Sequence, residues 1–137
     1  MGKHLAQFPE GRRSGKQANS TAVLLGHLVV YTDATDLELV ARCAADHSAL
    51  VAGVAAYDGS SGDGTGKEIG YFTSGDVLVR NTSGGAISAG ALLVSSSGGG
   101  VKAAAATNTN WVGKALEGAA DGEMLTVRLD IQTAILA

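Results

Sequence analysis

Asp46, His47 and Ser48 are adjacent residues with the side-chain types of a nucleophilic relay. In such a relay an acid orients a histidine, which takes the proton of a serine hydroxyl. Contiguous residues point in different directions, so these three do not form the required geometry. The sequence also lacks the G-x-S-x-G pattern that presents a nucleophilic serine on a sharp turn. We therefore expect no enzymatic activity and no catalytic residue.

A metal site is a second chemical possibility. Cys43 and His47 lie four residues apart and could share the face of a helical turn, with Asp46 as an outer partner. Two ligands do not make a zinc site, and His4 and His27 have no spacing that joins them to the pair. The single cysteine also excludes an intrachain disulfide. We expect a packed or surface Cys and His here, and neither metal nor cofactor.

The stretch 59–68 is Gly-rich and resembles a phosphate-binding loop. The pattern fails at both ends, because Ser61 stands at the first required glycine and Glu68 at the Mg²⁺-binding Ser/Thr. As a calcium loop it would offer Asp58 and Asp63, together with Ser60, but Ile69 occupies the place of the bidentate glutamate. The sequence favours a solvated turn.

The same loop supports an alternative function. A surface or secreted β-domain could bind a ligand such as a glycan through the loop from Asp58 to Lys67. Glycan sites usually contain exposed aromatic residues, whereas only Tyr57 and Tyr71 flank this loop.

Composition limits the classes of protein. The chain has 137 residues, 45% of them hydrophobic, 17% charged and only 4% aromatic. That length is typical of one domain, and the hydrophobic content excludes an intrinsically disordered chain. No apolar run reaches the ~20 residues of a membrane helix, so we expect no membrane partner. A core built mainly from Val, Leu, Ile and Ala is thin, so self-association is expected to help stabilise the fold.

Charge divides the chain into two parts. Residues 1–20 carry a net charge of +3 and the remaining residues −6. We interpret 1–20 as an extended N-terminal arm and 21–137 as a single β-rich domain. The acidic body lacks a row of aromatic residues for base stacking, so no nucleic-acid partner is expected. The candidate contact residues of the arm are the apolar anchors Leu5 and Phe8 and the basic residues Arg12, Arg13 and Lys16.

The body is predicted to be all-β. Short runs rich in β-branched and apolar residues alternate with Gly, Ser, Asp and Asn, and this spacing favours a barrel or sandwich over βαβ units. The most helix-like segment is 43–47. The predicted strands are 28–32, 37–41, 50–55, 69–72, 76–80, 91–94 and 125–129.

An internal repeat refines this prediction. Two halves of the body have matching phrases, which predicts two related β units packed as one barrel-like body. The longer first copy contains the loop from Asp58 to Lys67. The matched segments are 26–30 with 90–94, 40–45 with 101–106, 53–55 with 113–115, and 77–80 with 125–128.

The order of four phrases resembles a known family, the small head-decoration or capsid cement proteins of lambda-like tailed phages. The resemblance covers roughly residues 28–80, and residues 90–129 resemble the wider group of phage cement proteins. The phrases are Val30-Tyr31-Thr32-Asp33, Leu39-Val40-Ala41, Ala52-Gly53-Val54-Ala55-Ala56 and Tyr71-Phe72-Thr73-Ser74-Gly75.

This resemblance implies a function. It implies a β-tulip or barrel-like subunit that binds the major capsid protein as a homotrimer on the outside of the mature icosahedral head. Such a protein stabilises the shell against internal DNA pressure and is found on the virion and, during assembly, in the host cytoplasm. Asp33, Gly53 and the Thr73-Ser74-Gly75 turn would then be structural positions. The loop from Asp58 to Lys67 and the long second unit depart from the lambda-type pattern.

Overall fold

The chain forms ten β-strands in a computed structural model that describes residues 11–33, 35–59, 65–105 and 110–132. No part of the described chain is helical, and the described residues contain no helix able to cross a membrane. The prediction of an all-β, barrel-like fold is confirmed. The strands are β1 (Arg12–Gln17), β2 (Leu28–Tyr31), β3 (Leu39–Arg42), β4 (Val51–Ala55), β5 (Glu68–Phe72), β6 (Ser74–Arg80), β7 (Leu92–Ser95), β8 (Val101–Ala103), β9 (Trp111–Ala115) and β10 (Met124–Gln132).

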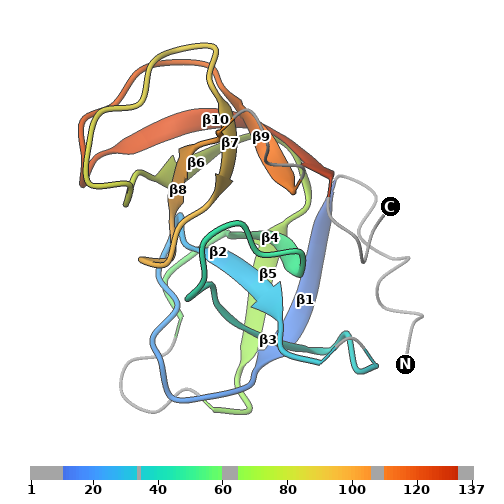
Figure 1. The fold of residues 1–137 in the computed structure, drawn as a ribbon. Helices are drawn as coiled ribbons and strands as arrows, with labels where there is room; N and C mark the ends of the chain where they lie inside the picture. Colours follow the sequence, from blue (N-terminus) through green and yellow to red (C-terminus); the bar gives the residue numbers. More distant parts are fainter. Residues whose placement is uncertain (1–10, 34, 60–64, 106–109, 133–137) are drawn as a thin grey trace.

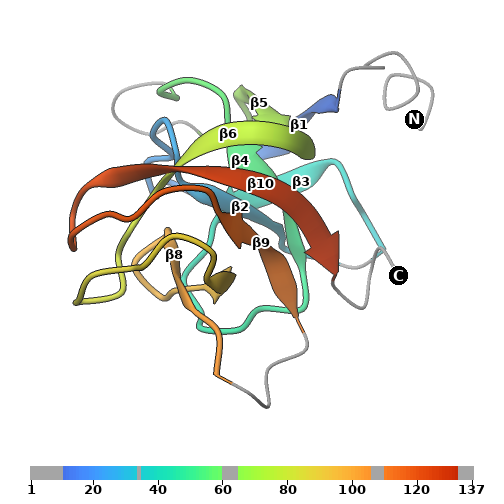
Figure 2. The same cartoon turned by 90° about the horizontal axis from the view of Figure 1, so that it is seen from above.

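The first five strands form a closed barrel in the order β1-β3-β2-β4-β5. Its pairs are antiparallel except that of β1 with β3, which is parallel and closes the ring at Lys16–Leu39 and Gln17–Val40. The last five strands form a sheet in the order β6-β10-β9-β7-β8. Figures 1 and 2 show this sheet, drawn from yellow-green to red, lying against the barrel, drawn from blue to green.

The two sheets repeat one topology. When the barrel is cut between β1 and β3, its order becomes β1-β5-β4-β2-β3, which matches β6-β10-β9-β7-β8 strand for strand. The match extends to details of the backbone. The amides of Gly26 and Gly90 both donate to the last residue of the matching strand, Ala55 or Ala115, at 3.2 and 2.8 Å, and both glycines have a positive φ.

One part of the predicted repeat is wrong. The sequence comparison paired residues 77–80 with 125–128, but β6 is the counterpart of β1, and β10 the counterpart of β5. The two segments instead pair with each other, with Val79 opposite Leu125 and Val77 opposite Val127. Their apolar alternation looks alike because both strands line the same core.

The predicted helical turn at 43–47 is also wrong. This segment is an irregular bend and turn, and His47 has a φ of 54°, in the left-handed region that side chains with a Cβ rarely adopt. A helical turn needs successive right-handed residues, so Cys43 and His47 do not share a helix face.

The expected arm differs from the structure at residues 12–17. Those residues form β1, which pairs with β5 from Arg12 to Lys16 and with β3 at Lys16 and Gln17. Lys16 lies opposite Glu68 on β5, a favourable pairing of opposite charges. The basic residues that marked this stretch as an arm therefore belong to the barrel wall. Residues 1–10 lie outside the described residues.

Two hydrophobic clusters fill the molecule. One lies inside the barrel and contains two buried tyrosines, Tyr31 and Tyr71. The other fills the second sheet and extends to the outside of the barrel, where Leu28, Val51 and Val54 of β2 and β4 belong to it. The barrel wall thus covers the inner side of the second sheet. This cluster comprises Leu28, Cys43, Val51, Val54, Val77, Val79, Ile87, Leu93, Val101, Val112, Ala115, Leu125, Val127 and Leu129.

Candidate interaction surfaces

Asp46 links the two units of the fold. Its carboxylate accepts hydrogen bonds from the Ser97 amide at 2.8 Å and from the Lys102 ammonium at 3.1 Å. These two hydrogen bonds hold the pKa of Asp46 below its ordinary value, and the bond from Lys102 has the larger effect. The carboxylate therefore attaches the β3–β4 connection to β8 and to the turn before it, and it does not orient a histidine.

His47 and Ser48 serve the same connection. The His47 amide donates to the Ser95 carbonyl at 3.1 Å, and the Ser48 amide donates to the Ser95 hydroxyl at 2.8 Å. The Ser48 hydroxyl accepts a hydrogen bond from the Leu50 amide at 3.1 Å. The three residue types that suggested a catalytic relay thus form a structural turn that joins the barrel to the second sheet.

Cys43 is fully buried in the cluster of the second sheet, whereas His47 is exposed. The Cys43 thiol donates to the Ala45 carbonyl at 3.2 Å. Among the described residues no group of three or more His, Cys, Asp and Glu side chains is placed to hold a metal ion. The structure separates the two candidate ligands.

The loop from Asp58 to Lys67 is described only at its ends. Asp58 accepts a hydrogen bond from the Leu25 amide at 2.9 Å, while Ser60, Ser61 and Asp63 lie outside the described residues. Of the two flanking aromatic residues, Tyr71 is fully buried and does not reach a ligand at the surface. Tyr57 is exposed, and its hydroxyl accepts a hydrogen bond from the Gly70 amide at 2.8 Å.

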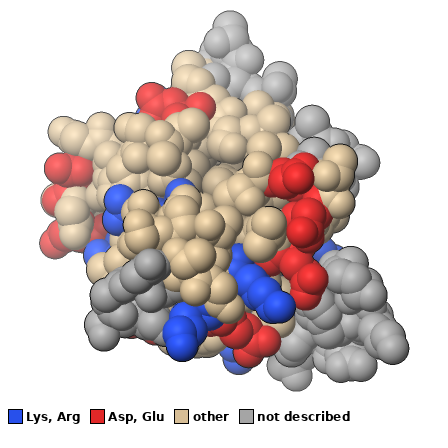
Figure 3. Space-filling model, turned by 90° about the horizontal axis from the view of Figure 1, so that it is seen from below, with Lys and Arg blue, Asp and Glu red and all other residues tan. Residues whose placement is uncertain are grey.

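The basic residues proposed as contacts point to different sides of β1. Arg12 and Lys16 are exposed on the outer side of the barrel, and the Arg12 guanidinium lies 5.3 Å from the centre of the Phe72 ring. Successive side chains of a strand point to opposite faces, so Arg13 lies on the other side of β1, half-buried opposite Tyr71. Leu5 and Phe8 lie outside the described residues. Figure 3 shows the barrel end of the molecule, where basic and acidic groups lie close to one another among uncharged residues.

His27 lies buried where the barrel meets the second sheet. Its Nδ1 accepts a hydrogen bond from the Leu24 amide at 2.9 Å, so the neutral ring carries its proton on Nε2. Burial, followed by the nearby guanidinium groups of Arg80 and Arg42, lowers the pKa of His27 to about 4, against an opposing effect of Asp58. The ring is neutral at physiological pH.

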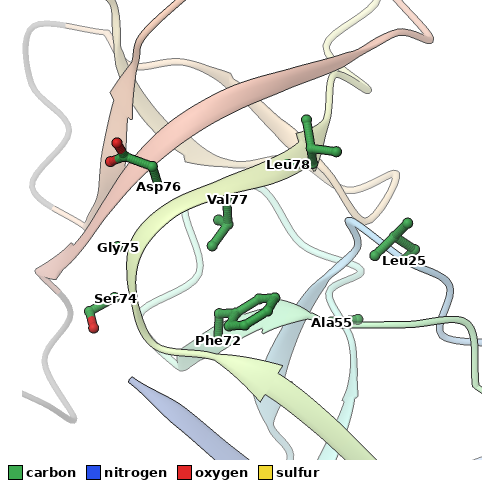
Figure 4. A pocket seen from close by; sticks show the side chains of 8 residues that line it. All are labelled: Leu25, Ala55, Phe72, Ser74, Gly75, Asp76, Val77 and Leu78. Carbon is green, nitrogen blue, oxygen red and sulfur yellow. The ribbon is translucent and has the colours of Figure 1, made fainter. Parts of the chain in front are cut away.

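An open groove of about 370 Å³ runs between the barrel and β6. Figure 4 shows Phe72 of β5 and Val77 of β6 on opposite sides of it, with Leu25 and Leu78 toward one end. Leu25 and Leu78 are among the most exposed large hydrophobic side chains of the described residues. The groove contains Asp76 as its charged residue, and its apolar lining fits a protein partner better than a small polar substrate.

A second, smaller groove of about 220 Å³ lies on the outside of the second sheet. It contains Leu92 and Trp111, both exposed, next to Lys114, Arg128 and Asp130. Sequence reasoning missed these surface residues. Leu78 and Leu92 sit in continuous apolar runs that give no sign of which side faces out. The lone Trp next to the polar residues 107–110 was the signal available.

The positions that the family resemblance marked as structural have structural contacts. Asp33 accepts hydrogen bonds from the amide and hydroxyl of Thr35, which hold its pKa below the ordinary value. Gly53 lies where the pairing of β2 with β4 shifts register, and a Cβ there would meet the Phe72 carbonyl oxygen. The Thr73 hydroxyl donates to the Gly11 carbonyl at 3.0 Å.

Comparison with known proteins gives a likeness to a solved structure. No family model matches the chain, and no curated protein matches it. Among solved structures, the fold is similar to the N base of the head fiber gp8.5 of bacteriophage phi29, with a TM-score of 0.65 and 20% sequence identity. The likeness covers 89% of this chain and 95% of that one. At this identity it concerns the fold, and the chain is thus similar in fold to a base domain from a phage head.

Proposed function

We propose that the chain is a structural protein attached to the head of a tailed phage. The observation that carries this proposal is the likeness of nearly the whole fold to the base of a phage head fiber, since it covers 89% of this chain. The described residues agree with a role in binding, because the candidate chemical motifs are used in turns and in the contact between the two units.

In its finer form, the proposal is a decoration or cement protein of the lambda-like type. It binds the major capsid protein on the outside of the mature icosahedral head as a homotrimer and stabilises the shell against DNA pressure. Three linked subunits that engage together gain avidity of about 10² or more over one subunit. A thin aliphatic core suits such a protein, because binding to its neighbours adds to its stability.

The capsid contact is proposed to include the N-terminal residues Leu5 and Phe8 together with Arg12 and Lys16 on the outer side of β1. Arg13 faces the other side of that strand, so we expect it to contribute less. Exposed basic side chains at the rim of an interface mainly change the association rate and its salt dependence.

The test measures binding to phage heads that lack this protein. Deleting residues 1–20 would remove β1 and open the barrel, so the sharper variant begins at Gly11 and keeps the strand. We expect that variant to lose most head binding, and Arg12→Gln with Lys16→Gln to bind more slowly at low salt. Arg13→Gln is the matched control and should bind nearly as the wild type does. Full-length protein that does not bind heads would refute the proposed function. Undiminished binding of the shortened chain would refute only the role of the arm.

A further inference from the structure

The outer face of the second sheet combines apolar and charged side chains. We define the outer face as Leu92, Trp111, Lys114 and Arg128. Leu92 is 46% exposed and Trp111 37%, although burying such side chains is normally favourable. Register places Leu92 beside Lys114 and Lys114 beside Arg128, so these three form a row across β7, β9 and β10.

The barrel has an equivalent face, and that face is already used. Its matching row is Leu28, Val54 and Phe72 across β2, β4 and β5, and Val51 is the counterpart of Trp111. Leu28, Val51 and Val54 are fully buried, because this side of the barrel packs against the second sheet. This face is therefore in contact with another β unit in the barrel, whereas the equivalent face of the second sheet is exposed.

We propose that the outer face packs against a second copy of this chain. The repeat supplies the argument for this partner: the equivalent face of the barrel binds a unit of this same fold, and a second copy presents such units again.

The charges on the face also fit this partner. Arg128 pairs with Asp76 at 3.0 Å, and Lys114 and Asp130 lie beside them. A surface with both signs in one small area favours a partner that also carries both, whereas a strongly acidic or basic partner would meet like charges. A tryptophan with an apolar neighbour, surrounded by charged residues, is typical of the centre of a binding surface. The inference rests on the self-association within the proposed function and names its surface.

The experiment measures the mass of the full chain in solution by sedimentation over a wide concentration range. The wild type should have a multiple of 13.7 kDa. Trp111→Ser and Leu92→Ser should each raise the dissociation constant by about 30-fold or more, the effect of removing a central contact residue. Leu25→Ser is the matched control, because Leu25 is similarly exposed at 36% but lines the groove beside β6.

A second variant guards against a folding defect. Lys114 is exposed, so Lys114→Glu should leave the fold intact while it makes the face uniformly more acidic and weakens association. A wild type that stays at 13.7 kDa at every concentration would overturn the inference. So would an oligomer that dissociates in Leu25→Ser and not in Trp111→Ser. Head binding is measured separately: an oligomer that depends on Trp111 but binds no heads would refute the head attachment and keep this interface.

Discussion

The barrel of β1–β5 and the sheet of β6–β10 have the same strand order, but only the barrel closes on itself. In the barrel the Lys16 amide donates to the Glu38 carbonyl, next to β3, at 2.6 Å. The counterpart of Lys16 is Arg80, and its amide donates to Gly26 of the first unit at 3.1 Å. In the second sheet, the hydrogen bond equivalent to the one that closes the barrel is therefore made to the barrel. An isolated bridge joins Asn81, just after β6, to Val101 of β8.

The difference between the closed barrel and the open sheet shows how one strand order can be stabilised in two ways. A closed ring satisfies its own edges, whereas an open sheet must be covered by something else. Here the outer side of β2 and β4 covers the open sheet, and this contact creates the larger of the two hydrophobic clusters. One topology thus occurs both as a closed barrel and as an open sheet that packs against it.

The largest expected effect compares two equivalent glycines. A Cβ at Gly53 would meet the Phe72 carbonyl oxygen and the Tyr71 ring, and a Cβ at Gly113 would meet the Arg128 carbonyl oxygen and Val127. A closed ring has less freedom to shift its strands, so we expect Gly53→Ala to lower the free energy of unfolding by about 3 kcal/mol and Gly113→Ala by about 1–2 kcal/mol. Urea unfolding measures both.

Gly85→Ala is the control for these two variants, because a Cβ at Gly85 meets nothing within 4 Å. Its effect should be below about 0.5 kcal/mol. Equal losses in Gly53→Ala and Gly113→Ala would show that closure does not stiffen the barrel.

A second comparison concerns two buried amides at equivalent positions, Gln17 and Asn81. The Asn81 side chain donates to the carbonyls of Gly85 and Ala119 and accepts from Ser83. Gln17 donates two hydrogen bonds, but its Oε1 has no partner within the described part of the chain. We expect Asn81→Leu to cost about 3 kcal/mol and Gln17→Leu about 1 kcal/mol, measured by thermal unfolding. A larger loss of unfolding free energy in Gln17→Leu than in Asn81→Leu would contradict the inference that the Gln17 Oε1 lacks a partner.

The third comparison uses pH. The unfolded chain protonates His27 near pH 6.5 and the folded chain only near pH 4, so the unfolded state binds more protons between these values. The unfolding free energy should therefore fall as the pH drops from 6.5 to 4, by about 2 kcal/mol from this residue. His27→Asn keeps an acceptor for the Leu24 amide and should remove this part of the pH dependence. The second unit has Ala91 at this position, so the effect belongs to the first unit; an unchanged pH profile would exclude His27 as its source.

The smallest effect concerns the barrel interior. The buried Tyr71 hydroxyl has no hydrogen-bond partner in the described structure, and the second sheet has Val127 at the equivalent position. Tyr71→Phe should therefore change the free energy of unfolding by less than about 1 kcal/mol, with stabilisation as the favoured sign. Calorimetry measures this, and a loss above 2 kcal/mol would mean that the hydroxyl is satisfied.

Several features were predictable from local patterns. Alternation of apolar residues with turn residues predicted the all-β class, and matching phrases predicted two related units. The candidate site was less predictable. Asp46, His47 and Ser48 have the right types for chemistry, but their hydrogen bonds include residues about 50 positions away, on β7, on β8 and in the turn between them. The basic run 12–16 looked like an arm because its outward residues are charged, while its pairing with β5 was invisible in the sequence.

The sequence by itself determined the β-rich class and the duplication, because these follow from residue types and their local order. Only the tertiary structure decided which unit closes, which outer face is buried and which is exposed. The rows Leu28-Val54-Phe72 and Leu92-Lys114-Arg128 occupy equivalent places, and their different burial depends on what packs against each sheet. Strand pairing joins residues far apart in the chain, so the side of a strand that faces a partner is fixed by long-range contacts.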